Sequence, residues 1–433
     1  MDLAWRHSYC GLFSMERDGV TWYFLDNEQY FRRPELYGYM DDGERFGFFS
    51  RAVVRMLPHL RFWPEVIHCN DWHTGLMGVF LKEDFSHDPF YQDMKLVYTI
   101  HNLKYQGIYP PSIMRDIIGL PQELFDNGNL ECDGCVNYMK SGLVYADRVT
   151  TVSPTYAQEI TYPYFGEGLD GYIRANSGKV SGILNGLDVD AYNPETDPYI
   201  KKQYSVATAR ADKRENKDAL RKELGLRIQR GVPLIAMVTR LVEDKGLDLV
   251  MRIMDELVDD EVQLVLVGTG DAGYEDAFRE LAYRHPNKVS ANIMFNEALA
   301  HKVYAASDMF LMPSRYEPCG LSQLIALRYG SIPIVRETGG LKDTVHPFNK
   351  YSRQGNGLTF PNFNAHELLF TMKRALGYYE DDSVWDQLVH NAMTSDYSWN
   401  QSADAYISLY EVYCSCKGLS IGSPVGYAAT GDS

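Results

Sequence analysis

The sequence predicts an α/β protein of two doubly wound domains, each a mostly parallel sheet with helices on both faces. Short apolar runs, typical of buried strands, alternate with amphipathic segments along most of the chain. The alternation breaks once, around residues 192–198, where proline, asparagine and acidic residues cluster. A chain of 433 residues also exceeds one ordinary core. We therefore expect domains at 1–195 and 196–395, then a helix at 396–417 and a mobile tail at 418–433.

The first domain is expected to begin with an aromatic strand at 21–25. Its other strands are rich in β-branched and aromatic residues, and its helices repeat apolar residues at helical spacing. Ser153 followed by Pro154 is typical of a helix start, because serine caps the helix and proline fits its first turn. The further expected elements, in chain order, are a helix at 46–56, a strand at 65–69, a helix at 74–82, and strands at 95–100, 148–152 and 180–184.

The second domain repeats the alternation after a charged helix at 210–224. Its apolar runs are short and continuous, as in parallel strands that are buried on both faces. Gly330 is expected to end the helix that begins at Gly320. The expected strands are 233–238, 262–267, 292–295, 308–312, 332–335 and 357–360. The expected helices begin at 245, 274, 299, 320, 338 and 365, and a last amphipathic helix covers 402–413.

Composition narrows the class of partner and the compartment. The formal net charge of −16 argues against nucleic acid or an anionic membrane as the main partner, whereas a neutral polymer is not repelled. No run is long enough to span a bilayer, and the first residues lack the apolar core of a signal peptide. Seven scattered cysteines fit reduced thiols in a cytoplasm. Cys132-x-x-Cys135 and Cys414-x-Cys416 have no histidine at zinc-finger spacing, which favours ordinary thiols.

Two polar loops follow neighbouring strands of the second domain and are expected to meet at one edge of its sheet. The first loop carries a carboxylate, Glu317, and a thiol, Cys319. The second loop, Thr338-Gly339-Gly340, presents backbone N–H groups at a helix N-terminus, where hydrogen bonding and the helix dipole favour an anion. A ligand with hydroxyls at one end and phosphate at the other fits both loops. A sugar nucleotide is such a ligand.

A third loop, residues 239–246, places Arg240 and Lys245 directly after a strand. Two fixed cations there can hold a diphosphate and stabilise the charge left on it when its bond to carbon breaks. For an isolated pair, solvated surface charges would be the better interpretation. The position at the carboxyl end of a strand favours the functional one.

Residues 268–273 match G-x-G-x-x-G after a strand, so a dinucleotide site has to be weighed. Glu297, after the next strand, has the place of an acid that binds ribose. Against this interpretation, the unit is the second of its domain, Asp271 intrudes beside the phosphate position, and Arg240 with Lys245 offers a better phosphate site. The pattern favours a tight turn near the nucleotide.

Asp188-Val189-Asp190 has the spacing of a D-x-D metal motif. It lies between Asn185-Gly186 and Asn193-Pro194, where aspartate is a common turn residue. We therefore interpret it as a turn and expect no required metal.

Polar residues also close two strands of the first domain. Asp71-Trp72-His73 ends one strand and His101-Asn102 ends the other. A lone histidine at a strand end is usually structural. Two such loops with hydrogen-bonding side chains, and a tryptophan that we expect to be exposed, indicate a surface for sugar hydroxyls and ring faces.

Together these segments resemble the family of bacterial glycogen synthases and plant starch synthases, which are retaining glucosyltransferases with the GT-B fold of two Rossmann-like domains facing a cleft. The matching blocks occur in the family's order through most of the chain. They are HCNDWHTGL (68–76), IHNLKYQGIY (100–109), ADRVTTVSPTYAQEI (146–160), GILNGLDVDAYNP (182–194), TRLVEDKGLDLV (239–250), PSRYEPCGLSQL (313–324), RETGGLKDTV (336–345) and YSW (397–399).

The resemblance implies a role for each matching residue and no cofactor, since ADP-glucose is a substrate. Arg240 and Lys245 would hold its diphosphate, with His101 beside the reacting carbon and Glu317 at the glucosyl unit. The last helix would cross back to brace the first domain. The other implied donor-binding residues are Asn185, Cys319, Gly320, Thr338, Gly339 and Gly340. The implied acceptor-binding residues are Tyr39, Asp71, Trp72, His73 and Asn102.

The chain departs from related families at one position and from its own family at its start. Sucrose- and trehalose-forming relatives carry a second glutamate at the position of Ile325. The glycogen and starch branch lacks that glutamate, as this chain does, which supports the glucan assignment. The family's first strand and K-x-G-G-L loop do not precede Thr21. We therefore expect a first domain that is incomplete at its N-terminus, with an exposed sheet edge and with weak activity or none. The alternatives are a glucan-binding fragment without catalysis and a related UDP-sugar-dependent glycosyltransferase; the oligomeric state stays open.

Overall fold

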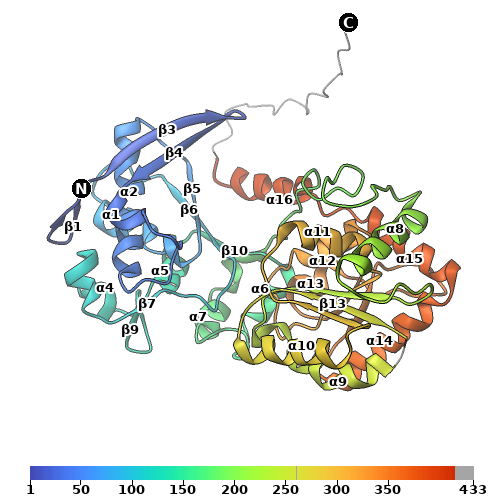
Figure 1. Cartoon of the computed structure of the whole chain (residues 1–433). Helices are drawn as coiled ribbons and strands as arrows, with labels where there is room; N and C mark the ends of the chain where they lie inside the picture. The colour runs from blue at the N-terminus through green and yellow to red at the C-terminus, as the bar shows by residue number, and fades with distance from the viewer. Residues whose placement is uncertain (260, 415–433) are drawn as a thin grey trace, which may run out of the picture.

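The computed structural model describes residues 1–259 and 261–414, which form two α/β domains side by side (Figure 1). The first domain holds a four-stranded parallel sheet and the second a six-stranded one. The predicted architecture of two parallel sheets is confirmed. The predicted limits of the domains stay a prediction, and the predicted tail at 418–433 lies outside the described residues.

The first sheet has the order β11-β10-β6-β5, with β5 at one edge. All four strands lie where the sequence predicts strands, and β6 is the most apolar of them. Large aromatic side chains such as Tyr98, Phe80 and Tyr138 are fully buried around the sheet. The bounds of the strands are β5 (Val66–Asn70), β6 (Lys95–Ile100), β10 (Arg148–Thr151) and β11 (Val180–Gly182).

The helices of the first domain are mostly short. The single helix predicted at 74–82 is wrong in detail, because a 3-10 turn, one α turn and a π turn follow one another there. The α-helices are α1 (Glu28–Phe31), α2 (Asp42–Leu60), α3 (Met77–Val79), α4 (Glu123–Asp126), α5 (Tyr138–Tyr145), α6 (Pro154–Glu159) and α7 (Asp170–Ala175). The other helical turns are η1 (Trp72–Thr74), η2 (Phe80–Asp84), η3 (Met114–Ile118) and η4 (Ser177–Lys179).

The predicted aromatic strand at 21–25 exists, but it lies outside the main sheet. It belongs to β4 (Val20–Asp26), which pairs with β3 (Gly11–Arg17) in an antiparallel hairpin that projects from the domain (Figure 1). Asp18 and Gly19 turn the hairpin with positive φ angles of 53° and 76°. The remaining short strands are β1 (Asp2–Leu3), β2 (Arg6–His7), β7 (Ile108–Tyr109), β8 (Glu131–Cys132) and β9 (Cys135–Asn137).

The second sheet has the order β14-β13-β12-β15-β16-β17, and its central strands are buried on both faces. Five of its six strands overlap their predicted positions closely. The predicted strand at 292–295 is displaced, because the observed strand begins at Val289 and ends at Asn292. The bounds are β12 (Leu234–Val238), β13 (Gln263–Val267), β14 (Val289–Asn292), β15 (Met309–Met312), β16 (Ile332–Arg336) and β17 (Leu358–Phe360).

Helices cover both faces of the second sheet. All the predicted ones exist, and α15 (Asp382–Thr394) is an additional helix that the sequence analysis missed. Gly330 follows α12 with φ of 64°, so the predicted stop is confirmed. The bounds of the others are α8 (Ala209–Glu223), η5 (Glu243–Lys245), α9 (Leu247–Asp259), α10 (Ala272–Arg284), α11 (Glu297–Ala306), α12 (Ser322–Arg328), α13 (Gly339–Thr344), α14 (Ala365–Tyr379) and α16 (Trp399–Glu411).

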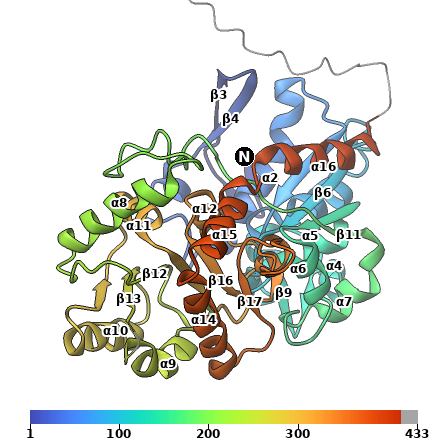
Figure 2. The ribbon, with the colours of Figure 1, turned by 90° about the vertical axis from the view of Figure 1, so that its right-hand side faces the viewer.

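The last described helix, α16, packs on the first domain, where the resemblance places it (Figure 2). The Tyr410 hydroxyl lies 2.6 Å from Nδ1 of His68 in β5, and the Ser402 hydroxyl donates to the Leu184 carbonyl. Burial lowers the pKa of His68 to about 4. The last helix that the structure describes therefore lies against the domain that holds residue 1.

Candidate active site

The carboxyl ends of two adjacent strands bring Lys245 and Glu317 together. Lys245 closes the turn η5 after β12, and Glu317 lies in the loop after β15. Their Nζ and Oε2 atoms are 2.7 Å apart, and the Ser314 hydroxyl donates to the same carboxylate oxygen at 3.0 Å. The side chains are only 18% and 10% exposed, so water screens the pair little. The loop of Lys245 thus meets the loop of Glu317 at this edge of the sheet.

Arg240 lies at the start of the same loop, exposed and turned toward the first domain. The neighbouring Tyr105 side chain raises the pKa of its guanidinium. Beside it, both carboxylate oxygens of Asp244 accept from Lys104 Nζ, at 3.1 and 3.2 Å, and one also accepts from the Tyr316 hydroxyl. Asp244 therefore joins the first domain to the residue that precedes Glu317.

Cys319 meets the first domain through Asn185. Burial raises the pKa of the Cys319 thiol to about 11, and the neighbouring Asn185 opposes that rise. Gly320 has φ of 71°, and a Cβ there would lie 2.4 Å from Oε1 of Gln323. Asn185, Cys319 and Gly320, all predicted to bind the donor, are thus in one place.

The backbone amides of the Thr338-Gly339-Gly340 loop are occupied by protein oxygens. The Gly339 amide donates to both carboxylate oxygens of Glu159 at 3.1 Å, and the Gly340 amide donates to the Glu317 carbonyl at 3.0 Å. The predicted anion contact at this loop stays a prediction, and it requires Glu159 to leave.

The loop that opens α12 differs in this respect. Within the described residues, the amides of Gly320, Leu321 and Ser322 donate to no protein oxygen. They follow Cys319 directly, on the side of Glu317. These amides are therefore free to bind a ligand oxygen without displacing a side chain.

On the side of the first domain, Asp71 fixes His101. Asp71 has φ of 56°, uncommon for a residue with a Cβ, and its carboxylate accepts from the His101 amide at 2.8 Å. The Asn70 amide oxygen lies 2.9 Å from Nε2 of His101. Asn102 turns its own amide oxygen to the Lys104 N–H. These contacts orient the imidazole and its loop.

Trp72 and His73 are less accessible than predicted. The expectation that Trp72 is exposed is wrong, since it is 8% exposed, stacked on the His73 ring and packed edge-on against Phe46. Burial also lowers the pKa of His73. Gly107 presses on Trp72, because a Cβ there would lie 2.4 Å from the indole. Trp72 thus supports its loop from the buried side and presents no ring face to a sugar.

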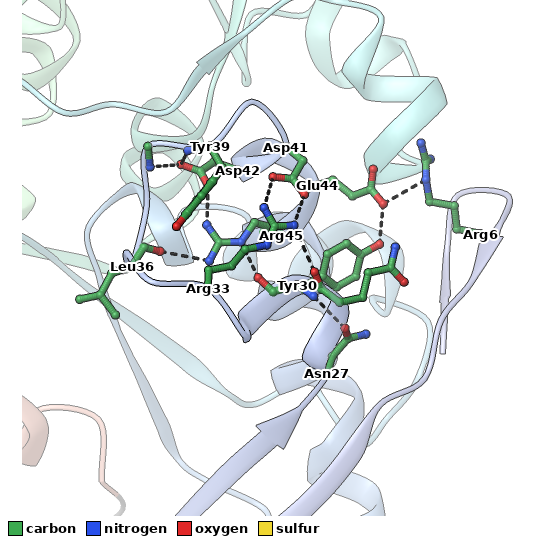
Figure 3. A network of polar contacts seen from close by, with 12 residues as sticks. Arg6, Asn27, Tyr30, Arg33, Leu36, Tyr39, Asp41, Asp42, Glu44 and Arg45 are labelled. Atoms are coloured by element: carbon green, nitrogen blue, oxygen red, sulfur yellow. Dashed lines mark hydrogen bonds and ion pairs between the residues drawn. The ribbon is translucent and has the colours of Figure 1, made fainter.

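Tyr39 belongs to a polar network in front of α2 (Figure 3). The Asp42 carboxylate accepts the amides of Gly38 and Tyr39 and pairs with Arg45, which is 2% exposed and also binds the Tyr30 carbonyl. The Tyr39 hydroxyl accepts the Glu35 amide. The network fixes a loop near His73, because Tyr37 packs on the His73 ring. Tyr39 itself is engaged within that loop.

The two ambiguous motifs find structural explanations. A Cβ at Gly268 would lie 1.8 Å from the Thr239 carbonyl, and one at Gly270 would lie 2.3 Å from the Leu241 carbonyl, so these glycines admit the loop that carries Arg240. The Asp188 carboxylate accepts the amides of Asp190 and Ala191, which confirms the turn.

Within residues 1–259 and 261–414, no three His, Cys, Asp or Glu side chains come together as metal ligands. The sequence analysis missed several polar residues that the structure brings to this site. Their signals are weak, because each is an ordinary charged or polar residue in a loop or at a helix end. They are Asn70, Lys104, Tyr105, Glu159, Asp244 and Asp343.

The sequence of the chain is similar to those of proteins of known type. Residues 1–175 match the family model "Starch synthase catalytic domain", and residues 217–387 match "Glycosyl transferases group 1". The chain is 53% identical over 409 residues to a glycogen synthase of Bacillus cereus strain B4264, covering 94% of this chain and 86% of that protein. A glycogen synthase of Geobacillus stearothermophilus is 52% identical, with 94% and 84% covered.

Solved structures with the same fold include two glycosyltransferases. The catalytic domain of starch synthase IV from Arabidopsis thaliana, bound to ADP and acarbose, superposes with a TM-score of 0.87 at 34% identity, covering 95% of this chain and 86% of that one. Sucrose-phosphate synthase from Thermosynechococcus elongatus shares the fold, with a TM-score of 0.56 at 20% identity and 88% and 81% covered.

Proposed function

The chain belongs to the glycogen and starch synthase family of retaining GT-B glycosyltransferases, and on that premise we propose that it transfers glucose from ADP-glucose to the non-reducing end of an α-1,4-glucan. The transfer breaks the bond between the glucosyl carbon and the diphosphate. It forms a new bond to the 4-hydroxyl of the acceptor with the anomeric configuration retained.

The observation that carries this proposal is the pairing of Lys245 with Glu317 at the edge of the second sheet, with Arg240 on the same loop. As ADP leaves, negative charge grows on the phosphate and positive character on the sugar. A cation and a carboxylate held side by side can stabilise the two opposite charges. Arg240 supplies the second cation for the diphosphate.

The remaining roles follow from the neighbours of this pair. Asn185, Cys319 and Gly320 contact the glucosyl unit, and the free amides of Leu321 and Ser322 supply hydrogen bonds to the donor's oxygens. The Thr338-Gly339-Gly340 loop acts on the donor indirectly, because its Gly340 amide donates to the Glu317 carbonyl while its Gly339 amide stays bonded to Glu159.

The acceptor comes from the other domain's side. His101 lies beside the transferred sugar, oriented by Asp71. Asn102, His73 and Tyr39 line the acceptor side, with Trp72 beneath them. ADP-glucose is a substrate, so no cofactor and no metal are needed.

Charge and chain composition support the choice of partners. A formal net charge of −16 suits a neutral polysaccharide better than nucleic acid or an anionic membrane. Among the helices that the structure describes, none is long and apolar enough to cross a membrane. We propose a cytoplasmic enzyme with these two substrates.

The test is transfer of radiolabelled glucose onto glycogen from ADP-glucose and, in parallel, from UDP-glucose. The proposal expects label in the polymer from ADP-glucose, released again by an amylase specific for α-1,4 linkages. Faster transfer from UDP-glucose would support the UDP-dependent alternative. Binding of glycogen without release of ADP would support the non-catalytic alternative, and either result would overturn the proposal.

A further inference from the structure

Two short helices from different domains, α6 and α13, each place a carboxylate against the start of the other. Glu159, the last residue of α6, accepts from the Thr338 hydroxyl at 2.9 Å and from the Gly339 amide at the start of α13. Asp343, near the end of α13, accepts from the amide and the hydroxyl of Thr155 at the start of α6, at 3.0 and 2.6 Å. Each carboxylate thus lies at the N-terminus of the other helix, where the helix dipole favours it. We call Glu159 and Asp343 the carboxylate latch.

The start of α13 is locked onto the loop that carries Glu317. The Gly340 amide donates to the Glu317 carbonyl. A Cβ at Gly339 would lie 2.1 Å from that carbonyl oxygen, and one at Gly340 would lie 2.0 Å from the Cys319 carbonyl oxygen. No space separates the two backbones, so α13 and the Glu317 loop move together.

The other side of α6 holds the loop that carries His101. The Tyr156 hydroxyl, on α6 and 2% exposed as a residue, accepts the Leu103 amide at 3.2 Å. The strand before α6, β10, pairs in parallel with β6, which ends at Ile100. Displacement of α6 therefore displaces the residues that follow His101.

Helix α6 thus connects the two halves of the site. Through Tyr156 it holds the first domain's loop, and through the carboxylate latch it holds the second domain's loop. We propose that Glu159 is a positioning residue for glucosyl transfer, which with Asp343 fixes Glu317 relative to His101 across the domain boundary. This inference rests on the proposed function, because it concerns how that function's two half-sites are aligned.

The geometry favours positioning over simple adhesion of the domains. A contact that only holds two surfaces together can form anywhere between them. This one ends on Gly339, the residue before the glycine whose amide donates to the Glu317 carbonyl. Small displacements there are costly, since misplacement by about 1 Å can reduce a rate roughly a hundredfold.

The experiment compares Glu159→Gln, Glu159→Ala and Asp343→Asn with the full wild-type chain. Gln158→Ala on α6 and Lys342→Gln on α13 are matched controls, because both side chains are exposed neighbours outside the latch. The measurements are kcat and KM for ADP-glucose with saturating glycogen, the Tm, and the radius of gyration by small-angle X-ray scattering.

We expect kcat to fall by about tenfold or more in Glu159→Ala and less in Glu159→Gln, which keeps one accepting oxygen. In both Glu159 variants the KM for ADP-glucose should stay within about twofold of the wild-type value. The two controls should match the wild type in kcat, KM, Tm and radius of gyration. The double variant Glu159→Gln with Asp343→Asn should lose less than the product of the two single losses, because both residues hold the same pair of helices, α6 and α13, together.

A lower Tm with wild-type kcat in Glu159→Gln would overturn the inference, as would equal losses of kcat in the controls. If the wild-type chain itself transfers no glucose, the proposed function fails while the latch can still be judged. In that case a larger radius of gyration for the Glu159→Ala, Asp343→Ala double variant supports the latch, and an unchanged one refutes it.

Discussion

The ammonium group of Lys245 lies 2.7 Å from Oε2 of Glu317, and the two residues come from loops that are 72 positions apart in the chain. Each is mostly buried, so each depends on the other for the neutralisation of its charge. A diphosphate that binds near Lys245 therefore competes with Glu317 for its protons. This coupling makes the pair the most informative target for mutation.

Lys245→Ala is expected to reduce kcat/KM by about ten- to a hundredfold. A charge-assisted hydrogen bond contributes roughly 1.5–3 kcal/mol, and about 1.4 kcal/mol corresponds to tenfold in rate. The fold should persist with a lower Tm, because Glu317 loses its partner. Steady-state transfer from ADP-glucose measures the effect, with Lys222→Ala, at an exposed position of α8, as the control. Wild-type kinetics would remove Lys245 from the mechanism.

Glu317→Gln tests the negative charge of the Glu317 side chain separately from its shape. Glutamine can still accept from Ser314 and Lys245, so the loop should stay in place while the negative charge is lost. We expect a loss of kcat similar to that of Lys245→Ala, with little change in KM for glycogen. A variant that changes only its Tm would show that Glu317 is structural.

Gly339→Ala should damage the site by a steric clash alone. Its Cβ would lie 2.1 Å from the Glu317 carbonyl oxygen, and its φ of 43° is unfavourable for alanine. We expect a destabilisation of about 1–3 kcal/mol together with a loss of transfer activity. The matched control is Gly377→Ala in α14, where a Cβ meets no atom within 4 Å, and which should be neutral or slightly stabilising. Urea unfolding and the transfer assay compare the two; equal effects would contradict the steric explanation.

The order of strands and helices was predictable because buried parallel strands are short apolar runs, and this held for β12, β13, β15 and β16. The position of β14 was not predictable, because Val289-Ser290-Ala291-Asn292 is weakly apolar. Its place is fixed by pairing with β13. The predicted run 292–295 is the more apolar one, yet Phe295 is 93% exposed. The hairpin β3–β4 carried a readable Asp18-Gly19 signal that was overlooked.

At the site, the residues that follow strands were predictable and the contacts across domains were not. Glu317 and Lys245 were found because the carboxyl ends of parallel strands share one edge. The partner of Gly339, Glu159, is 180 positions away and meets it only when two separately folded domains dock. No local pattern encodes that contact. The glycines at 268 and 270 were noticed, but their reason is the backbone of the Arg240 loop.

A buried lysine in the second domain gives the chain a pH dependence that can be assigned to one residue. Lys213 in α8 donates to the carbonyls of Ala305 and Tyr329, both at 2.9 Å, near the ends of α11 and α12. Burial lowers the pKa of Lys213 to about 7, from 10.5 for an exposed lysine. Between these two values the unfolded chain binds more protons than the folded chain does. The free energy of unfolding therefore rises with pH across this window, and the penalty for burying the charge is complete below about pH 7.

We accordingly expect the urea midpoint of the wild-type chain to increase from pH 7 to pH 9 more than that of Lys213→Met, which has no proton to lose. One group can contribute at most about 1.4 kcal/mol per pH unit. At every pH the variant also lacks the hydrogen bonds to the two carbonyls, so the difference in slope, rather than the midpoint itself, reports the titration. Lys222→Met, on an exposed position of the same helix, should keep the wild-type slope. Parallel curves for the wild type and Lys213→Met would show that Lys213 stays charged throughout this range, held by the helix-end carbonyls against the cost of burial.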